Sequence, residues 1–361
     1  MLPHLIDRRA PWFAFLLHFR EHDDLYRVGG SSLLRRYSGS EEEFKTKMCS
    51  MPPLVAAEVT FGFAPIRGEV VGIMRMPEEM IGREAVRAVV EGVELAATRG
   101  ARVVGLGALT ASATRGGERL LAELPRGVLV TNGNAYTAAV VRQNVVSTVK
   151  GLELGRTPVV AIVGCTGSVG VPATRLVAEE GYELVLVGRT ARRVERELGD
   201  LDATFAGSID AVHSADLVVL LTSDPAARLR PEHVRAGATV IDFAHPVNLE
   251  RELWRGFHDR GVSLYEGAGI EIPHYRCNLI GSGFGVANVT APACLAETYL
   301  IAKEGIGESS VGRPSLDFVH KLERVAARHG VHPAPLKPLG APEPRTASAG
   351  QPDEPALEPT R

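Results

Sequence analysis

Three glycines at three-residue intervals follow an apolar run, and together they could bind a phosphate group. The run Val159–Val163 is rich in β-branched residues, as is typical of a strand buried on both faces, and Gly164, Gly167 and Gly170 come after it. Such glycines allow a tight turn, close approach of the backbone to a pyrophosphate, and packing of the next helix on the strand. The free N–H groups and the positive dipole end of that helix attract the anion. The predicted cofactor-binding residues of the turn are Gly164, Thr166, Gly167, Ser168, Val169 and Gly170.

The residue after the next apolar run distinguishes the two nicotinamide cofactors. Residues 183–188 are predicted to form a second strand, and Arg189 and Thr190 follow it. An acid at this position binds the ribose 2′-hydroxyl of NAD, whereas an arginine accommodates the 2′-phosphate of NADP. With Arg192 and Arg193 one turn further on, the sequence favours NADPH, held in part by Arg189 and Thr190. The alternative is an ordinary basic start of a helix.

Cys294 is the cysteine with the most distinctive surroundings. Pro is favoured at the first position of a helix and Thr is a common cap, so Thr290 and Pro292 predict a helix that begins at Ala291 or Pro292. Cys294 would then lie in the first turn, where the helix dipole stabilises a thiolate. An activated cysteine opposite a nicotinamide suggests attack on a thioester, followed by hydride transfer to the acyl-enzyme. The alternative is a small apolar residue that packs the helix against a sheet.

The other three cysteines carry less information. Cys277 lies in a predicted polar loop and is a second candidate nucleophile, whereas Cys49 is expected to pack in a core and Cys165 to occupy a variable position of the glycine turn. The four show no metal-ligand spacing, so we expect free thiols and no metal site.

Two polar residues lie at the start of a predicted long helix between the domains. Asn134 and Thr137 are predicted to contact the substrate or the nicotinamide amide. The alternative for Asn134 is that it only caps the helix.

Further candidates end the later strands of the predicted nucleotide domain. Thr222 and Ser223 are expected to line the cofactor ribose. Asp242 and His245 follow the next strand, at the sheet edge where cofactors bind in such folds, although polar loop residues are common there. Gly267 would allow the backbone to approach the nicotinamide, unless it only forms a turn.

These residues need a scaffold of alternating strands and helices. Strands are expected at residues 12–19, 54–63, 69–74, 102–106, 127–131, 159–163, 183–188, 216–222, 238–243 and 262–265. Helices are expected at residues 41–48, 77–100, 118–124, 135–154, 292–305 and 315–329, with one more after the glycine turn. The fold class is therefore α/β.

The chain is long enough for two domains. Residues 1–134 are predicted to form an N-terminal α/β domain that binds the substrate, and residues 135–156 a helix that bridges the domains. Residues 157–330 are predicted to form a C-terminal Rossmann domain, a doubly wound parallel sheet that binds NADP and carries the helix of Cys294. Residues 331–361, rich in Pro and Ala, are expected to be a disordered tail.

Composition excludes several function classes. The chain has 45% hydrophobic and 23% charged residues, values typical of a soluble globular protein. Its net charge of −3 gives no reason to expect nucleic-acid binding. The apolar runs are too short to span a membrane, and the absence of a signal-peptide pattern favours the cytoplasm.

Several landmarks, taken in order, resemble the cyanobacterial long-chain acyl-[acyl-carrier-protein] reductases. They are residues 77–80, 105–110, 131–138 and 164–170, together with Arg189 and the Ala-Cys-Leu-Ala-Glu motif at residues 293–297. The resemblance implies that Cys294 carries an acyl group and that NADPH reduces it to a fatty aldehyde. It implies an acyl-carrier protein or acyl-coenzyme A as substrate and an aldehyde-consuming enzyme as partner. Tyr136 stands where the family has a histidine and is assigned to substrate binding, while residues 281–285 depart from the family.

Two alternatives come from other classes. One is a shikimate-dehydrogenase-like oxidoreductase that acts with NADP on a small alcohol or ketone and in which Cys294 is only structural. Those enzymes use a Lys-Asp pair in the substrate domain, for which the sequence offers no convincing equivalent. The other is a sensor that binds NADP without catalysis.

Overall fold

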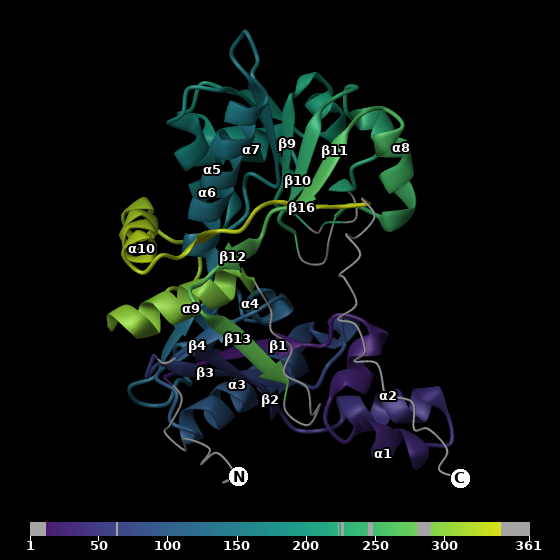
Figure 1. Cartoon of the computed structure of the whole chain (residues 1–361), viewed down its shortest axis with the longest axis vertical. Coiled ribbons are helices and arrows are strands. Elements are labelled where there is room, and N and C mark those ends of the chain that lie inside the picture. Colours follow the sequence, from purple (N-terminus) through teal and green to yellow (C-terminus); the bar gives the residue numbers. More distant parts are fainter. Residues whose placement is uncertain are drawn as a thin grey trace, which may run out of the picture.

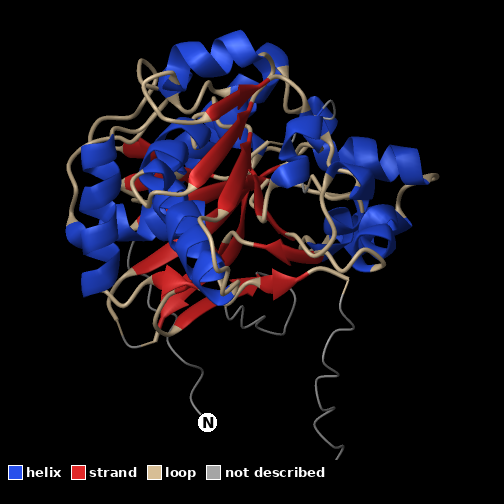
Figure 2. Cartoon of the chain, turned by 90° about the horizontal axis from the view of Figure 1, so that it is seen from above, coloured by secondary structure: helices blue, strands red, loops and turns tan. Residues whose placement is uncertain are grey.

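The computed structural model describes residues 12–340 except 63, 223, 225–226, 245–247 and 280–289. The described chain forms two α/β domains, drawn one above the other in Figure 1. Seen from above, helices surround the central strands (Figure 2). The predicted fold class is confirmed.

A six-stranded sheet forms the core of the N-terminal domain, in the order β13-β2-β3-β1-β4-β5. Its strands are β1 (Phe13–His18), β2 (Leu54–Phe61), β3 (Arg67–Ile73), β4 (Val103–Leu106), β5 (Leu129–Thr131) and β13 (Tyr275–Leu279). β2 and β3 pair as an antiparallel hairpin, and β1, β3, β4 and β5 run parallel.

Both faces of β1 are buried because its residues alternate between two cores. Phe13 and Phe15 pack in the same core as Tyr299 of α9 (Ala293–Glu304), whereas Ala14 and Leu16 pack in the same core as Val89 of α3 (Gly82–Thr98). The sheet therefore lies between α9 on one side and α3 on the other.

Two predicted helices of this domain are shorter than expected. The helix predicted at 77–100 consists of a 3₁₀ turn, η2 (Pro77–Glu79), followed by α3, because Ile81 is extended, with φ −130° and ψ 144°, and breaks the helix before Gly82. The helix predicted at 118–124 is only the 3₁₀ turn η3 (Glu118–Leu120). The remaining helical elements here are η1 (His22–Arg27), α1 (Ser31–Arg36), α2 (Glu41–Cys49) and α4 (Leu109–Ala113).

The second domain contains a seven-stranded sheet in the order β16-β11-β10-β9-β6-β7-β8. Its parallel strands are β6 (Val159–Val163), β7 (Glu183–Val187), β8 (Thr204–Ala206), β9 (Leu217–Leu220), β10 (Thr239–Asp242) and β11 (Ser263–Glu266). Counted along the chain, their order is 3-2-1-4-5-6, that of a dinucleotide-binding Rossmann sheet. The helical elements here are α6 (Gly170–Ala178), α7 (Ala191–Leu198), α8 (Trp254–His258), η4 (Ile209–Ser214), η6 (Pro231–His233) and η7 (Arg251–Leu253).

The helix α5 (Asn134–Gly151) lies between the two sheets in the chain, and it packs against α6, α9 and α10 (Leu316–Arg328). Arg142 on α5 forms ion pairs with Glu180 at 3.0 Å and with Glu323 of α10 at 2.9 Å. A continuous cluster of buried residues extends from the N-terminal sheet through α9 and α5 to β6.

The predicted boundary of the second domain differs from the structure. β13 pairs antiparallel with β2, so residues 275–279 belong to the N-terminal sheet. α9 likewise packs on β1 and β4, and it lies between the two sheets in Figure 1. A Cβ on Gly105 of β4 would lie 2.0 Å from Oγ1 of Thr298, which shows how closely α9 approaches the sheet. These contacts are distant in sequence and leave no local pattern.

The predicted disordered tail is wrong for residues 331–340. β15 (His332–Pro333) pairs with β12 (Gly269–Glu271), which also pairs with β14 (Ala291–Pro292) in a small third sheet. β16 (Lys337–Pro338) pairs with β11, and Leu339 is buried. Backbone pairing fixes this segment, including the bond from Leu339 N–H to the carbonyl oxygen of Leu264 at 2.9 Å. A composition rich in Pro and Ala gives no sign of such pairing. Residues 341–361 lie outside the described part of the chain.

Candidate dinucleotide site and domain junction

The glycine turn after β6 has a backbone that excludes side chains at its first and last positions. Gly164 has a φ of +88°, and a Cβ there would lie 2.9 Å from Cβ of Thr222. A Cβ on Gly170 would lie 2.2 Å from the carbonyl oxygen of Gly164. Gly167, between them, is exposed to solvent. The two outer glycines therefore set the turn, and the middle one leaves it open to a ligand.

The turn presents unpaired backbone donors at the start of a helix. The N–H groups of Thr166, Ser168 and Val169 have no hydrogen-bond partner among the described residues. They immediately precede α6, whose positive dipole end favours an anion. The turn also lies between β6 and β9, where the strand order reverses and where open α/β sheets bind their ligands. The fold and the turn together define a dinucleotide-binding site of the Rossmann type.

Positive charge lies beside this turn. Arg189 follows β7, its side chain is 75% exposed, and its Nε lies 3.5 Å from Oδ2 of Asp224. An open depression at the start of α7 is lined by Thr190, Arg192, Arg193, Glu195 and Arg196. Nε of Arg193 is buried without a partner in the described part of the chain. The hydroxyl of Thr190 accepts a hydrogen bond from Arg193 N–H at 3.3 Å, so this residue caps α7.

The polar residues after β9 and β10 shape the loops at the site. Asp242 is buried, and its carboxylate accepts backbone hydrogen bonds from Ala244 at 2.8 Å, Asn248 at 2.7 Å and Leu249 at 3.1 Å. Burial raises the pKa of Asp242 to about 6, although these bonds favour the charged form. Oγ1 of Thr222 accepts a bond from Asp224 N–H at 3.1 Å.

Asn248 joins the loops that follow β9 and β10, and it was not among the residues predicted from the sequence. Its amide donates to the carbonyl oxygens of Thr222 at 3.0 Å and Ala227 at 3.2 Å, and it accepts from Leu229 N–H at 3.1 Å. A lone Asn in a loop carries no sequence signal for such a role. Of the other residues predicted here, Ser223 and His245 lie outside the described residues.

Arg20, just after β1 in the N-terminal sheet, lies close enough to Glu266 at the end of β11 for their charges to interact. Hydrogen bonding to Asp24 raises the pKa of Arg20, which follows β1, and the charge of Glu266 at the end of β11 raises it further. The start of α9 also contacts the segment after β11, where Ala293 N–H donates to the carbonyl oxygen of Ala268 at 3.1 Å. A substrate at this junction would therefore lie near both domains.

Cys294 lies at this junction, in the first turn of α9, but it is not an activated thiol. It is mostly buried but keeps some exposed surface, whereas the other three cysteines are buried. A Cβ on Gly133 would lie 2.2 Å from Cβ of Cys294, so the turn after β5 touches this residue. Burial raises the pKa of the thiol to about 12, and the charge of Glu297 raises it as well. The predicted thiolate is wrong, because desolvation outweighs the helix dipole.

The residues predicted to bind substrate are engaged in bonds within the protein. Nδ2 of Asn134 donates to the carbonyl oxygen of Gly312 at 3.2 Å, and Oγ1 of Thr137 donates to that of Gly133 at 2.7 Å. Tyr136 is fully buried, and its hydroxyl donates to the carbonyl oxygen of Val331 at 3.2 Å. The structure thus places Tyr136 in the core and the other two, half-buried, at the junction.

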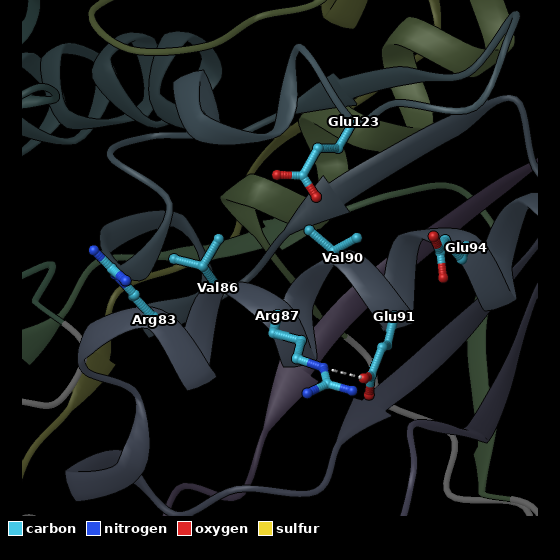
Figure 3. Close-up of a pocket in the computed structure, with 7 residues that line it drawn as sticks. All are labelled: Arg83, Val86, Arg87, Val90, Glu91, Glu94 and Glu123. Atoms are coloured by element: carbon cyan, nitrogen blue, oxygen red, sulfur yellow. Dashed lines mark hydrogen bonds and ion pairs between the residues drawn. The ribbon is translucent and has the colours of Figure 1, made fainter.

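A separate open groove of about 410 Å³ runs along the outer side of α3 (Figure 3). It is lined by Arg83, Val86, Arg87, Val90, Glu91, Glu94 and Glu123. Arg87 and Glu91 pair within it at 3.1 Å. Because α3 covers the face of the sheet opposite to α9, this groove lies apart from the junction.

Comparisons with known proteins find distant relatives. No protein-family model matches the chain. The aminotransferase PigE of Serratia sp. (strain ATCC 39006) is 27% identical over 319 residues, covering 84% of this chain and 37% of that protein. The chain thus spans little more than a third of the length of this curated relative.

Two solved structures with a similar architecture are dehydrogenases. Shikimate dehydrogenase from Aquifex aeolicus has 11% identity and a TM-score of 0.41, over 90% of this chain and 100% of that one. Shikimate 5-dehydrogenase from Thermus thermophilus, in complex with NADP(H) and shikimate, has 16% identity and a TM-score of 0.39, over 88% and 98%.

These comparisons contradict the family expected from the sequence. The curated relative is named an aminotransferase, so the assignment to the acyl-[acyl-carrier-protein] reductases is wrong. The acyl thioester substrate, the fatty aldehyde product and the acyl-enzyme at Cys294 are dropped with it. The landmarks behind the resemblance are short and rich in Gly and Ala, and similar turns occur in enzymes with different activities. In the described part of the chain, no helix is long and apolar enough to cross a bilayer, and no group of side chains could hold a metal ion.

Proposed function

We propose that this protein is an NADP(H)-dependent oxidoreductase that interconverts an alcohol and a carbonyl group of a small substrate at the junction of its two domains. The observation that carries the proposal is the open glycine turn, with unpaired N–H groups of Thr166, Ser168 and Val169 at the point where the strand order reverses. Such donors suit the diphosphate of a dinucleotide.

The charge beside the turn favours NADP(H) over NAD(H). Arg189 is the second residue after β7, and a Cβ on the preceding Gly188 would lie 3.5 Å from Oγ1 of Thr166 in the turn. A 2′-phosphate bound there would be neutralised by Arg189, with Arg192 and Arg193 at the start of α7. The ion pair of Arg189 with Asp224 would give way to this stronger anion. When bound, the cofactor supplies or accepts the hydride.

The substrate site is assigned to the junction around Cys294. With a pKa of about 12 its thiol stays protonated at neutral pH, so it serves as a weak hydrogen-bond donor and not as a nucleophile. Gly133 and Ala268 bring the backbone of both domains to this point. The half-exposed Asn134 and Thr137 complete the proposed lining, whereas the buried Tyr136 supports it from behind.

This activity is of the class that the shikimate dehydrogenases represent, but the proposal rests on the turn and its place in the sheet. The activity named for PigE is not transferred, because the match covers only 37% of that protein.

A substrate screen tests the proposal. NADPH oxidation is followed with a panel of small ketones and aldehydes, and NADP⁺ reduction with the corresponding alcohols. We expect turnover with at least one pair and a rate with NADPH well above that with NADH. Turnover of NADH alone would contradict the cofactor assignment, and hydride transfer only to acyl thioesters would contradict the substrate class.

A further inference from the structure

A buried carboxyl group lies behind Cys294, and nothing in the proposed reaction uses it. Glu297 is one turn further along α9 and has no exposed surface. Among the described residues, no basic side chain pairs with it. An unpaired buried carboxylate costs folding free energy unless several hydrogen bonds stabilise it.

The hydrogen-bond donors to Glu297 come from three separate segments. Oε1 accepts from the hydroxyl of Thr131 at the end of β5, and Oε2 accepts from Tyr136 N–H at 2.7 Å. The backbone of Ala135 and the side chain of Ser310 also bond to the carboxyl group. Glu297 therefore joins β5, α5 and the segment after α9 at one point.

Two of these donors belong to the first turn of α5, where backbone N–H groups have no partner within the helix. Gly133 precedes α5 and has no side chain with which to cap it. Glu297 thus caps α5 from a different helix. Gly133 is also the residue that touches Cys294, so the cap and the contact lie in the same turn.

We propose that Glu297 is a positioning residue: by capping α5 from α9, it fixes the Gly133 turn against Cys294 and so sets the geometry of the domain junction. This inference rests on the proposed function only where it assumes that the junction binds a substrate, because the cap itself needs no ligand. The same residue also connects the bridging helix to the N-terminal sheet, through Thr131.

Hydrogen exchange and thiol modification of the full-length protein test the role without any substrate. Glu297→Gln keeps the size of the side chain but presents an amide N–H₂ to donors that need an acceptor. Glu304→Gln, at the far end of the same helix, is the control, because its carboxylate pairs with Arg328 and His329 and not with α5. In Glu297→Gln we expect amide exchange at residues 134–137 to accelerate about tenfold or more, the effect of losing one hydrogen bond to a charged group.

The second readout is the alkylation of Cys294 by iodoacetamide over a range of pH, located by peptide mass. Loss of the nearby charge should move the alkylation profile to lower pH. A general loosening would also lower the thiol pKa by hydrating it, so hydrogen exchange outside residues 134–137 distinguishes the two causes. The control should match the wild type in both measurements. Unchanged exchange at residues 134–137, or equal acceleration throughout both domains, would overturn the proposal.

A milder variant keeps the test decisive if Glu297→Gln does not fold. Thr131→Val removes one donor while preserving shape, and it should accelerate exchange at residues 134–137 by a smaller factor; no change would overturn the role. NADPH affinity, measured on the same proteins, should not change. If the wild type binds no NADPH while the exchange result holds, the proposed function fails and the cap remains.

Discussion

At the residue scale, the glycine turn depends on contacts that a single added carbon would disturb. A Cβ on Gly170 would lie 2.2 Å from the carbonyl oxygen of Gly164 and 2.8 Å from the backbone of Cys165. Both neighbours are backbone atoms, so the strain cannot be relieved by moving a side chain. The turn must therefore shift if this glycine is replaced.

Gly170→Ala is expected to weaken NADPH binding at least tenfold and to lower the free energy of unfolding by about 1–3 kcal/mol, because overpacking displaces the turn. Isothermal titration and urea unfolding measure the two effects. Gly155→Ala is the control, since nothing lies within 4 Å of a Cβ added there. Normal NADPH affinity in Gly170→Ala would show that the turn does not hold the cofactor.

Asp242 gives a prediction for pH dependence. Burial raises its pKa from 3.8 to about 6, so between these values the folded protein holds a proton that the unfolded chain has lost. Its contribution to stability is therefore present below about pH 3.8 and is lost as the pH rises through 6. Relative to Asp242→Asn, the wild type should lose up to about 3 kcal/mol over this range in urea unfolding experiments. A difference that grows in favour of the wild type with rising pH would contradict the assigned shift.

At the scale of elements, α9 is placed by the sheet beneath it and not by its own sequence. Its residues predict a helix, and the prediction is correct to within two residues at its start. Its position on β1 and β4 depends on Gly105, where any side chain would meet Thr298 and Phe15. That contact joins residues almost two hundred positions apart, and a single sequence shows no trace of it.

A double-mutant cycle tests this packing. Gly105→Ala should lower the free energy of unfolding by about 1–3 kcal/mol through overpacking. Thr298→Ala removes the nearest atom, so it should restore part of the loss when combined with Gly105→Ala, while contacts with Phe15 remain. Strictly additive effects in chemical denaturation would contradict the close approach of α9 to β4.

How much of the fold and the site could be predicted from the sequence depends on how far apart in the chain the interacting residues lie. The strand Val159–Val163 and the glycines after it form a local pattern, so the turn and an α/β fold with a Rossmann domain could be predicted from the sequence. Whether β13 joins the first sheet, and whether Cys294 is desolvated, depends on atoms far away in the sequence. Tyr136 was assigned to substrate by resemblance alone, and the structure buries it.

At the scale of the whole molecule, the chain crosses between the domains more than once. It passes from the first sheet to the second through α5, returns in β13 and α9, and then runs back to pair with β11 in β16. The continuous buried cluster through α5 and α9 joins the two sheets. The final crossing ends with Leu339, which packs in a cluster of buried residues of the Rossmann domain.

Leu339→Ala should destabilise the protein by about 2–4 kcal/mol, the cost of removing a buried leucine side chain. Thermal unfolding of the variant beside Leu336→Ala, a partly buried neighbour, measures the difference. A loss at Leu339 no larger than at Leu336 would mean that the last crossing is not part of the folded core.

The central claim, that Arg189 and the glycine turn bind NADPH, is tested most directly by calorimetric titration of the wild type, Arg189→Ala and the control Arg255→Ala with NADPH and with NADH. Arg255 is 92% exposed on α8, away from the turn. The account predicts that the wild type prefers NADPH and that Arg189→Ala loses about 1.5–3 kcal/mol for NADPH, the range of a hydrogen bond to a charged group, with little change for NADH. Arg255→Ala should bind as the wild type does. Equal affinity of the wild type for both cofactors, or no binding of either, would contradict the account.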